Sequence, residues 1–408
     1  PGANQMIPLS VGWNIMSFCV SPSIMNMMDI VQPLIDASAL VKVSDEAGGF
    51  IQYITGPGWM NTIGDMENTE GYYFNLSGSE NLSVDGTKVI FPFDIPLLSG
   101  WNIMGYPVDV SQDAMTILQP LIDDGYLVKV LDETGGMIQF ITGFGWINTI
   151  NTFDPGEGYH INVNTNSTLT LTDPGKGITP YIAPEAPATA HFTTLTGNPF
   201  LPMNIIIRDI YSDGFMVEDG DELAVFDGAI EVGSMVVRKS SKGYQLLTAR
   251  ADDPVTTAAD GFSEGNELTF RYWDKSEDIL YTDVQATHVF GNIDFTGLGT
   301  YGADLKIGSL GFGENGQPSA NYLGQNYPNP YTDQTNIEYG VAENAHVVLS
   351  IYDVYGRLVR VIEDKYREPG KYLVTLNGSS MEAGIYYYKL EIIGENSKFS
   401  KTQKMILY

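Results

Sequence analysis

The chain has 408 residues, of which 50 are acidic and 21 basic, so its formal net charge is −29. A surface of that sign repels nucleic acid and anionic membranes, and we exclude both as partners. The length exceeds what one hydrophobic core usually serves, which predicts several domains.

Strand-forming residues alternate with turn residues along the whole chain. It contains 24 Tyr and 44 Gly, and Tyr, Thr, Val and Ile recur between Asn-Gly, Asp-Gly and Gly-Gly turns, a pattern typical of β-strands. The sequence therefore predicts a mainly β multidomain protein. The single cysteine, Cys19, excludes an intrachain disulfide and is expected to be a small buried hydrophobic residue. The start at Pro1 suggests a processed or trimmed chain.

The first 174 residues contain a duplication. The segment LSVGWNIMSF from Leu9 matches LLSGWNIMGY from Leu97, and EGYYFNL from Glu70 matches EGYHINV from Glu157. Between them, VQPLIDASALVKVSDEAGGFIQYITGPGWMNTI matches LQPLIDDGYLVKVLDETGGMIQFITGFGWINTI. Two copies predict two tandem homologous β-rich (α+β) modules, over residues 1–87 and 88–174.

Each copy is expected to contain a strand, a short helix and four or five further short strands. In the first copy the helix is predicted to start at Ser23 as N-cap and to bend or end at Pro33. Four tryptophans stand at equivalent places in the repeats: Trp13, Trp59, Trp101 and Trp146. Large aromatic residues repeated with a fold usually form its core, but exposed ones can stack against sugar rings, and both interpretations stay open here.

A Pro-rich linker is predicted over residues 175–190, followed by a seven- or eight-stranded β-sandwich over 191–310. Two segments of that domain, DGDELAVFDG and EGNELTFRYWD, resemble accessory β domains of secreted Bacteroidetes-type proteins. Asp219, Asp221 and Asp227 could bind calcium, although their spacing does not match an EF-hand loop and acidic Gly-Asp turns are usually only turns. A second linker, 311–321, contains Gly311, Gly313 and Gly316, which we interpret as linker glycines and not as a phosphate-binding loop.

The last 87 residues, 322–408, have the strand and turn pattern of a compact seven-stranded Ig-like sandwich. Three of their segments, LGQNYPNPYTDQTNIEYGV, VVLSIYDVYGRLVRVI and AGIYYYKLE, followed by the terminal KTQKMILY, resemble the type A C-terminal sorting domain of the type IX secretion system. Tyr331 stands where that family commonly has Phe, and Thr332-Asp333 where it has Asn-Pro.

The resemblance implies a secretion signal and a location on the outer-membrane surface or outside a Gram-negative bacterium of the Bacteroidetes–Chlorobi type. It also implies a partner, the type IX secretion machinery. The residues that carry the signal would be Asn326, Tyr327, Pro328, Asn329, Pro330, Gly356, Arg357 and Lys404.

Catalysis is not expected. The four histidines, His160, His191, His288 and His346, are scattered without metal-type spacing, and no cofactor is predicted apart from possible calcium. Two functions remain: a self-assembling extracellular filament or surface-layer subunit, or an adhesin that binds polysaccharide through its repeated aromatics. Residues 1–190 hold 4 basic and 20 acidic residues, whereas the last 89 hold 9 and 10. Unlike charge favours a head-to-tail homopolymer.

Overall fold

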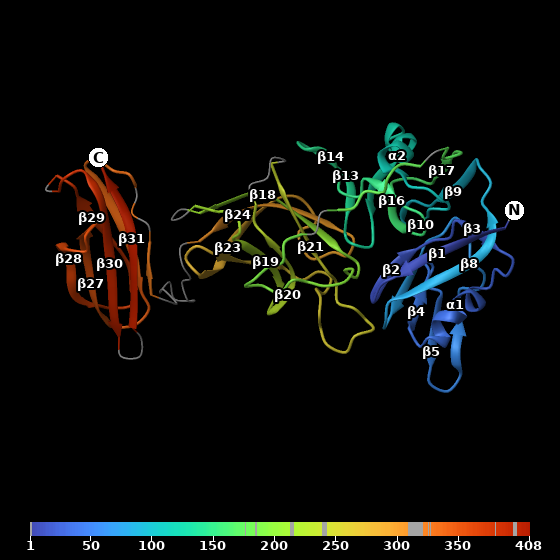
Figure 1. Cartoon of the computed structure of the whole chain (residues 1–408), viewed down its shortest axis with the longest axis horizontal. Helices are drawn as coiled ribbons and strands as arrows, with labels where there is room; N and C mark the ends of the chain where they lie inside the picture. Colours follow the sequence, from blue (N-terminus) through green and yellow to red (C-terminus); the bar gives the residue numbers. More distant parts are fainter. Residues whose placement is uncertain are drawn as a thin grey trace.

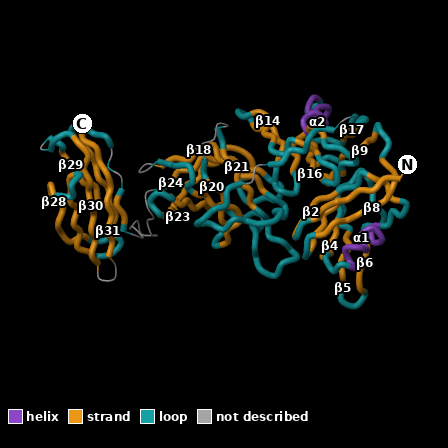
Figure 2. Tube along the Cα trace, viewed as in Figure 1, coloured by secondary structure: helices purple, strands orange, loops and turns teal. Residues whose placement is uncertain are grey.

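The computed structural model describes residues 2–175, 177–183, 186–212, 216–238, 243–308, 321–324, 326, 328–379, 381–394 and 398–408. Strands account for 54% of the structure and helices for 5%, which confirms the predicted mainly β class. The strands belong to four successive folding units, which Figure 1 shows from the N-terminal modules, drawn in blue and green, to the C-terminal domain in red. Figure 2 shows that the two short helices both lie in the N-terminal half.

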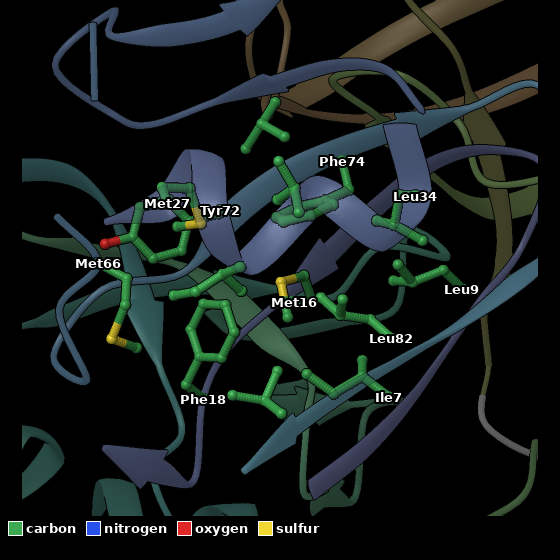
Figure 3. Packing of buried hydrophobic residues seen from close by; sticks show 14 of the residues in the cluster. Ile7, Leu9, Met16, Phe18, Met27, Leu34, Met66, Tyr72, Phe74 and Leu82 are labelled. Atoms are coloured by element: carbon green, nitrogen blue, oxygen red, sulfur yellow. The ribbon is translucent and has the colours of Figure 1, made fainter. Parts of the chain in front are cut away.

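Module 1 consists of two sheets and one helix. The smaller sheet has the order β1-β8-β3 and the larger sheet the order β2-β7-β4-β5-β6. The bounds are β1 Gly2–Leu9, β2 Gly12–Met16, β3 Val20–Pro22, α1 Met27–Asp36, β4 Leu40–Ser44, β5 Phe50–Ile54, β6 Gly58–Asn61, β7 Tyr72–Leu76 and β8 Glu80–Lys88. One core fills the space between these elements, and it includes Met27 and Leu34 of the helix, Phe74 of β7 and Leu82 of β8 (Figure 3).

The first helix differs from the sequence prediction at its start, and Pro33 does not end it. It begins after Asn26, not Ser23, because the Asn26 side chain accepts a hydrogen bond from the Met28 amide at 3.1 Å. Pro33 lies within the helix, which continues to Asp36. Cys19 is buried in the module core as expected.

Module 2 repeats this arrangement. Its five-stranded sheet has the order β10-β16-β12-β13-β14, which is the order of equivalent strands in module 1. The two sequence repeats therefore share one fold. The bounds are β9 Phe93–Leu97, β10 Gly100–Gly105, β11 Gln112–Asp113, α2 Ala114–Asp123, β12 Leu127–Leu131, β13 Met137–Ile141, β14 Gly145–Asn148, β15 Thr152–Phe153, β16 Gly158–Val163 and β17 Ser167–Leu171.

The middle domain, residues 186–308, forms one continuous sheet of seven strands instead of the two stacked sheets of a sandwich. The sheet curls, and its two edge strands meet where the Arg250 amide donates to the Val232 carbonyl at 3.0 Å. The order is β20-β19-β22-β23-β24-β18-β21. The bounds are β18 Met203–Ser212, β19 Glu222–Asp227, β20 Ile230–Val236, β21 Gln245–Ala249, β22 Leu268–Asp274, β23 Ile279–Gly291 and β24 Thr300–Ile307.

The C-terminal domain has seven strands in two sheets, ordered β25-β26-β29 and β28-β27-β30-β31, around one buried core. Its bounds are β25 Tyr322–Leu323, β26 Gln334–Val341, β27 Ala345–Asp353, β28 Leu358–Arg367, β29 Gly370–Asn377, β30 Gly384–Gly394 and β31 Lys398–Leu407. The domain contacts the middle domain at Glu277, which forms an ion pair with Lys401 and accepts hydrogen bonds from Gln403 at 3.2 Å. The predicted linker glycines Gly311, Gly313 and Gly316 lie outside the described residues.

Candidate functional site: the repeat interface, the domain dock and the sorting segment

The two modules face one another through equivalent residues. The Ile15 amide of module 1 donates to a Glu133 carboxylate oxygen at 2.8 Å, and the equivalent Ile103 amide of module 2 donates to Glu46 at 2.6 Å. Backbone bridges are reciprocal as well, joining Met16 to Glu157 and Met104 to Glu70. Because each contact has a counterpart with the modules exchanged, the interface has an approximate two-fold axis.

Glycine is required close to this axis. A Cβ atom on Gly71 would lie 2.9 Å from an Ile103 methyl carbon, and one on Gly158 would lie 2.8 Å from an Ile15 methyl carbon. Both positions therefore admit close approach of the two backbones only because they lack a side chain.

Tyr73 and His160, which are equivalent residues of the two repeats, meet on the axis. Their side chains form a hydrogen bond between the Tyr73 hydroxyl and His160 Nε2, and their ring centroids are 5.1 Å apart. Burial, with the nearby positive charge of Lys129 as a smaller cause, lowers the pKa of His160 to about 3. Burial raises the pKa of Tyr73 above its usual value. Both rings are therefore neutral over the physiological range.

Carboxylates surround the axis on both sides. Burial, reinforced by the charges of Glu46 and Glu67, raises the pKa of Glu70 to about 7. Burial also raises the pKa of Glu133 to about 7, against the hydrogen bond that it accepts from Ile15. Burial and the charge of Glu133 raise the pKa of Glu157 well above its usual value. The repeat interface therefore keeps protons on acidic groups near neutral pH.

A buried lysine holds the middle domain against module 2. Lys129 is only 3% exposed. Its side-chain nitrogen donates to the Leu298 and Gly299 carbonyls at 2.9 and 2.6 Å and to the Thr300 hydroxyl at 2.8 Å. Thr300 in turn donates to the Gln139 side chain at 2.7 Å. Three acceptors compensate the cost of burying the amine, although burial holds the pKa of Lys129 well below its usual value.

Apolar packing surrounds these hydrogen bonds. One buried cluster spans both domains, with Leu131, Met137, Ile141 and Ile147 from module 2 and Ile206 and Leu298 from the middle domain. Module 1 reaches the middle domain through Trp13, whose indole nitrogen donates to Asp253 at 2.7 Å and whose ring packs on Phe200. The first three domains therefore form one unit with buried contacts between its parts.

The four repeated tryptophans occupy different environments. Trp13 is 5% exposed between module 1 and the middle domain, whereas its equivalent Trp101 is 36% exposed. Trp59 and Trp146 are half-buried against the cores of their own modules, and each forms an edge-to-face pair with an exposed ring, Tyr53 and Phe140 respectively.

The three candidate calcium ligands do not lie together. Asp221 accepts hydrogen bonds from the Tyr272 hydroxyl and from the Lys275 amide at 3.0 Å, just before β19. Asp227 ends the same strand and accepts from the Ser263 amide at 2.8 Å. Asp219 lies in the turn before Asp221. Within the described residues, no three His, Cys, Asp or Glu side chains are grouped so that they could hold a metal ion.

The sorting segment, which comprises the predicted signal residues from Asn326 to Pro330, is hydrogen-bonded to the rest of the C-terminal domain through two asparagines. Asn326 is buried; its amide donates to the Tyr388 hydroxyl at 2.7 Å and its side chain donates to Thr335 at 2.9 Å. Asn329 donates to the Lys404 carbonyl at 3.2 Å and accepts from the Ile406 amide at 2.8 Å, which places the segment along β31. Pro328 and Pro330 are exposed, and Tyr327 lies outside the described residues.

The remaining residues of the predicted signal lie on the surface. Gly356 has a φ of +74° in the turn between β27 and β28, a conformation that favours glycine. Arg357 follows it and donates to Asp353 at 2.6 Å, with three quarters of its side chain exposed. Lys404 is exposed on β31. The structure thus brings Asn329 and Lys404 together but places the Gly356 turn separately.

Sequence reasoning missed the groups that build the repeat interface and the contact with the middle domain: Glu46, Glu133, Tyr73, His160 and Lys129. A signal for most of them was present. The motif Asp-Glu-x-Gly-Gly occurs in both repeats, and so does the Lys of LVKV. Polar residues kept at equivalent places of a duplication indicate a contact that both copies inherit.

The C-terminal domain belongs to a known class of export modules. Residues 325–408 match the model of the secretion system C-terminal sorting domain, which confirms the resemblance drawn from the sequence. This domain implies export by the type IX secretion system to the cell surface or the extracellular space of a Bacteroidetes-type bacterium. No helix of the described residues is long and apolar enough to cross a membrane.

Apart from this family match, the similarity of the chain to other proteins is low. No curated protein matches it. A β-glucuronidase of Parabacteroides merdae is 12% identical with a TM-score of 0.19, over 50% of this chain and 25% of that one. Dimeric latent PorU from Porphyromonas gingivalis is 13% identical with a TM-score of 0.22, over 70% and 30%. A tetra-tandem repeat in the extending region of a large adhesion protein is 9% identical with a TM-score of 0.18, over the whole of both chains. This chain spans less than a third of the first two structures.

Proposed function

We propose that this protein is a non-enzymatic extracellular structural subunit that polymerises head to tail after export. The observation that carries the proposal is the packing of modules 1 and 2 and the middle domain into one unit, joined by a buried lysine and a shared apolar cluster. Such joints suit a subunit that transmits force or spaces other groups, because relative motion of the domains would expose apolar surface.

The contact between subunits would join unlike surfaces. The first 190 residues have 20 acidic and 4 basic residues, whereas the last 89 have 10 and 9. In the C-terminal domain, β28 lies at the edge of its sheet and exposes Leu358, Val361 and Tyr366 beside Arg360 and Lys365. An exposed apolar edge strand with basic side chains is a surface on which an acidic neighbour can pair.

Electron microscopy and light scattering of the purified full chain, over a range of salt and calcium concentrations, test this proposal. Filaments or growing particles are expected at low salt, with fewer at high salt because screening weakens the charge contact. Leu358→Glu together with Val361→Glu should abolish them. A monodisperse monomer under every condition would contradict polymerisation.

A second candidate function is adhesion to polysaccharide through aromatic rings. The observation that favours it is the repeated pair of exposed and half-buried rings on the two hairpins, Tyr53 with Trp59 and Phe140 with Trp146. Tyr53 and Phe140 are 59% and 55% exposed. A polysaccharide pull-down in which Tyr53→Ala and Phe140→Ala each reduce binding would support adhesion, and unchanged binding would exclude these rings.

The sorting domain should act in export. Deletion of residues 322–408 is expected to leave the other domains folded and trapped in the periplasm, because the C-terminal and middle domains have separate hydrophobic cores and the contacts described at Glu277 are polar. Immunoblots of periplasmic and surface fractions measure the outcome. Surface display of the truncated chain at the normal level would refute this role.

A further inference from the structure

The approximate two-fold axis creates two equivalent docking surfaces, of which the middle domain covers one. The first dock is the outer face of β12, β13 and β14 together with Trp13 of module 1. Its residues are Lys129, Met137, Gln139, Ile141, Ile147 and Trp13, and all but Gln139 are buried. The second dock is the outer face of β4, β5 and β6 together with Trp101 of module 2.

The second dock carries the same side-chain types in the same register. Lys42 pairs with Gln52 across β4 and β5 as Lys129 pairs with Gln139 across β12 and β13. Phe50, Ile54 and Met60 stand where the first dock has Met137, Ile141 and Ile147. Lys42 and Lys129 are two of the four basic residues in the first 190. The Lys–Gln pair that contacts the middle domain in the first dock is therefore also present in the second dock.

The second dock is open where the first is closed. Met60 is 38% exposed against 2% for Ile147, and Trp101 is 36% exposed against 5% for Trp13. Lys42 is half-buried whereas Lys129 is 3% exposed. The Gly135 carbonyl accepts from Asn204 of the middle domain at 2.8 Å, and the equivalent Gly48 is exposed.

We propose that the second dock binds a β domain of another protein that presents the same surface as this chain's middle domain. That surface offers backbone carbonyls and a hydroxyl to the lysine ammonium, a carboxylate to the tryptophan indole, an amide to the glycine carbonyl, and apolar side chains between them. Each of these groups contacts the equivalent residue of the first dock in this structure. The second dock then makes the exported chain a carrier for a second β domain.

A second copy of this chain is the weaker occupant. Its middle domain already covers its own first dock, so binding elsewhere would exchange one contact for an equivalent one and add the entropic cost of association. A domain from another protein has no such internal competitor. The inference therefore does not rest on polymerisation, and a chain that stays monomeric would leave it standing.

Two residues of the second dock differ from their equivalents in the first dock. Ser44 replaces Leu131, and Pro57 replaces Phe144, whose ring packs edge-to-face on Tyr244 of the middle domain. Both differences remove apolar contact, so binding in the second dock is expected to be weaker and reversible.

The test uses full chains, with this protein's own middle domain as the probe. The donor is a variant of the full chain whose middle domain is free to bind another chain. Its substitutions Lys129→Ala and Ile147→Asp disable the first dock and release the middle domain, and Met60→Asp disables the second dock. Hydrogen exchange of β18 should rise in the donor, which verifies release. Sedimentation velocity of donor mixed with wild-type chain should then show a one-to-one complex. A second donor with Met137→Asp in place of Ile147→Asp guards against a folding defect specific to the first.

The matched acceptors decide the site. Met60→Asp or Lys42→Ala in the acceptor should weaken the complex at least about tenfold, which is a change of about one decade in Kd. Ser44→Leu with Pro57→Phe should strengthen it. Absence of a complex with a released donor at about 100 μM, a concentration that detects Kd values up to that range, would overturn the proposal. So would a complex that persists unchanged with both weakened acceptors. If β18 stays protected from hydrogen exchange in the donor, the first dock does not hold the middle domain as described. That result would also overturn the proposal.

Discussion

Tyr73 and His160 are equivalent residues of a duplicated sequence, and in the folded chain they are hydrogen-bonded to each other. Their contact marks the axis around which Glu46 and Glu133 reach the opposite module. The duplication is therefore a structural interface as well as a sequence repeat, and its charge state depends on groups that are buried together.

Acid should weaken the repeat interface through His160. Its pKa is about 3 in the fold and near 6.5 in the unfolded chain, so the unfolded state binds more protons between these values. Stability should therefore fall as pH falls from about 6.5 toward 3. In His160→Gln this part of the pH dependence should flatten, as measured by urea denaturation at several pH values. A slope that His160→Gln leaves unchanged would assign the acid sensitivity to other groups.

A rise in pH toward neutral should weaken the same interface through its carboxyl groups. The pKa of Glu133 is about 7 in the fold against a usual value of 4.5, so the folded state binds more protons and stability is lost as pH rises from about 4.5 through 7. Glu133→Gln should remove about 1–3 kcal/mol of that loss, because a neutral amide keeps the acceptor for Ile15. Asp124→Asn, on the exposed end of α2, is the matched control for the replacement of one carboxyl group by an amide.

The close approach of the modules should not tolerate side chains at the glycines. Gly158→Ala and Gly71→Ala are each expected to lower stability by about 1–3 kcal/mol, since the added methyl would overlap an isoleucine of the other module. Gly78→Ala is the matched control, because a Cβ there meets nothing within 4 Å. Equal thermal stability of all three variants would contradict the described packing.

Equivalent lysines should differ in their contribution. Lys129→Ala leaves three acceptors of the middle domain without their buried donor and should cost about 2–4 kcal/mol. Lys42→Ala, at the same place of module 1, should cost less than about 0.5 kcal/mol because the residue is half-buried without that packing. Guanidinium denaturation of both variants measures the difference, and similar losses would show that the two surfaces are used alike in one chain.

The buried asparagine of the sorting segment should support the fold of its domain. Asn326→Ala removes the donor to Thr335 and should destabilise the C-terminal domain by about 1–3 kcal/mol. Pro328→Ala, two residues later and exposed, is the control for stability alone, because Pro328 is itself a predicted signal residue. Denaturation followed by tyrosine fluorescence gives the stability, and surface immunoblots give the export. Normal export of an unfolded Asn326→Ala domain would separate recognition from folding.

The sequence predicts the repeats and the last domain well because both depend on local signals. Gly-Trp-Asn-Ile-Met begins a strand in each module, and the residues after Thr332 alternate as the strands β26 and β27 require. The start of the first helix could not be placed as well, because Ser23 and Asn26 are both good caps and the choice depends on Asn61 and Gly64 nearby. The curled sheet of the middle domain also escaped prediction, since which edge strands meet is decided by contacts distant in sequence.

The sequence does not show which of two equivalent aromatic residues becomes buried against another domain. Trp13 and Trp101 both stand in the motif Gly-Trp-Asn-Ile-Met, yet one is buried and the other is partly exposed. The difference comes from Phe200 and Asp253, which lie 187 and 240 residues further along the chain. Residue type alone gives no information about such a partner.

The reciprocal contacts between the modules have the symmetry of a homodimer interface. A contact that joins equivalent positions around a two-fold axis is the contact that a homodimer of a single module makes. Joining the two subunits of such a homodimer in one chain would give the arrangement seen here, with the stoichiometry fixed at two modules by the covalent link. In a homodimer of one module the residue on the axis would meet its own copy, whereas here Tyr73 and His160 are different residues that form a complementary hydrogen-bonded pair.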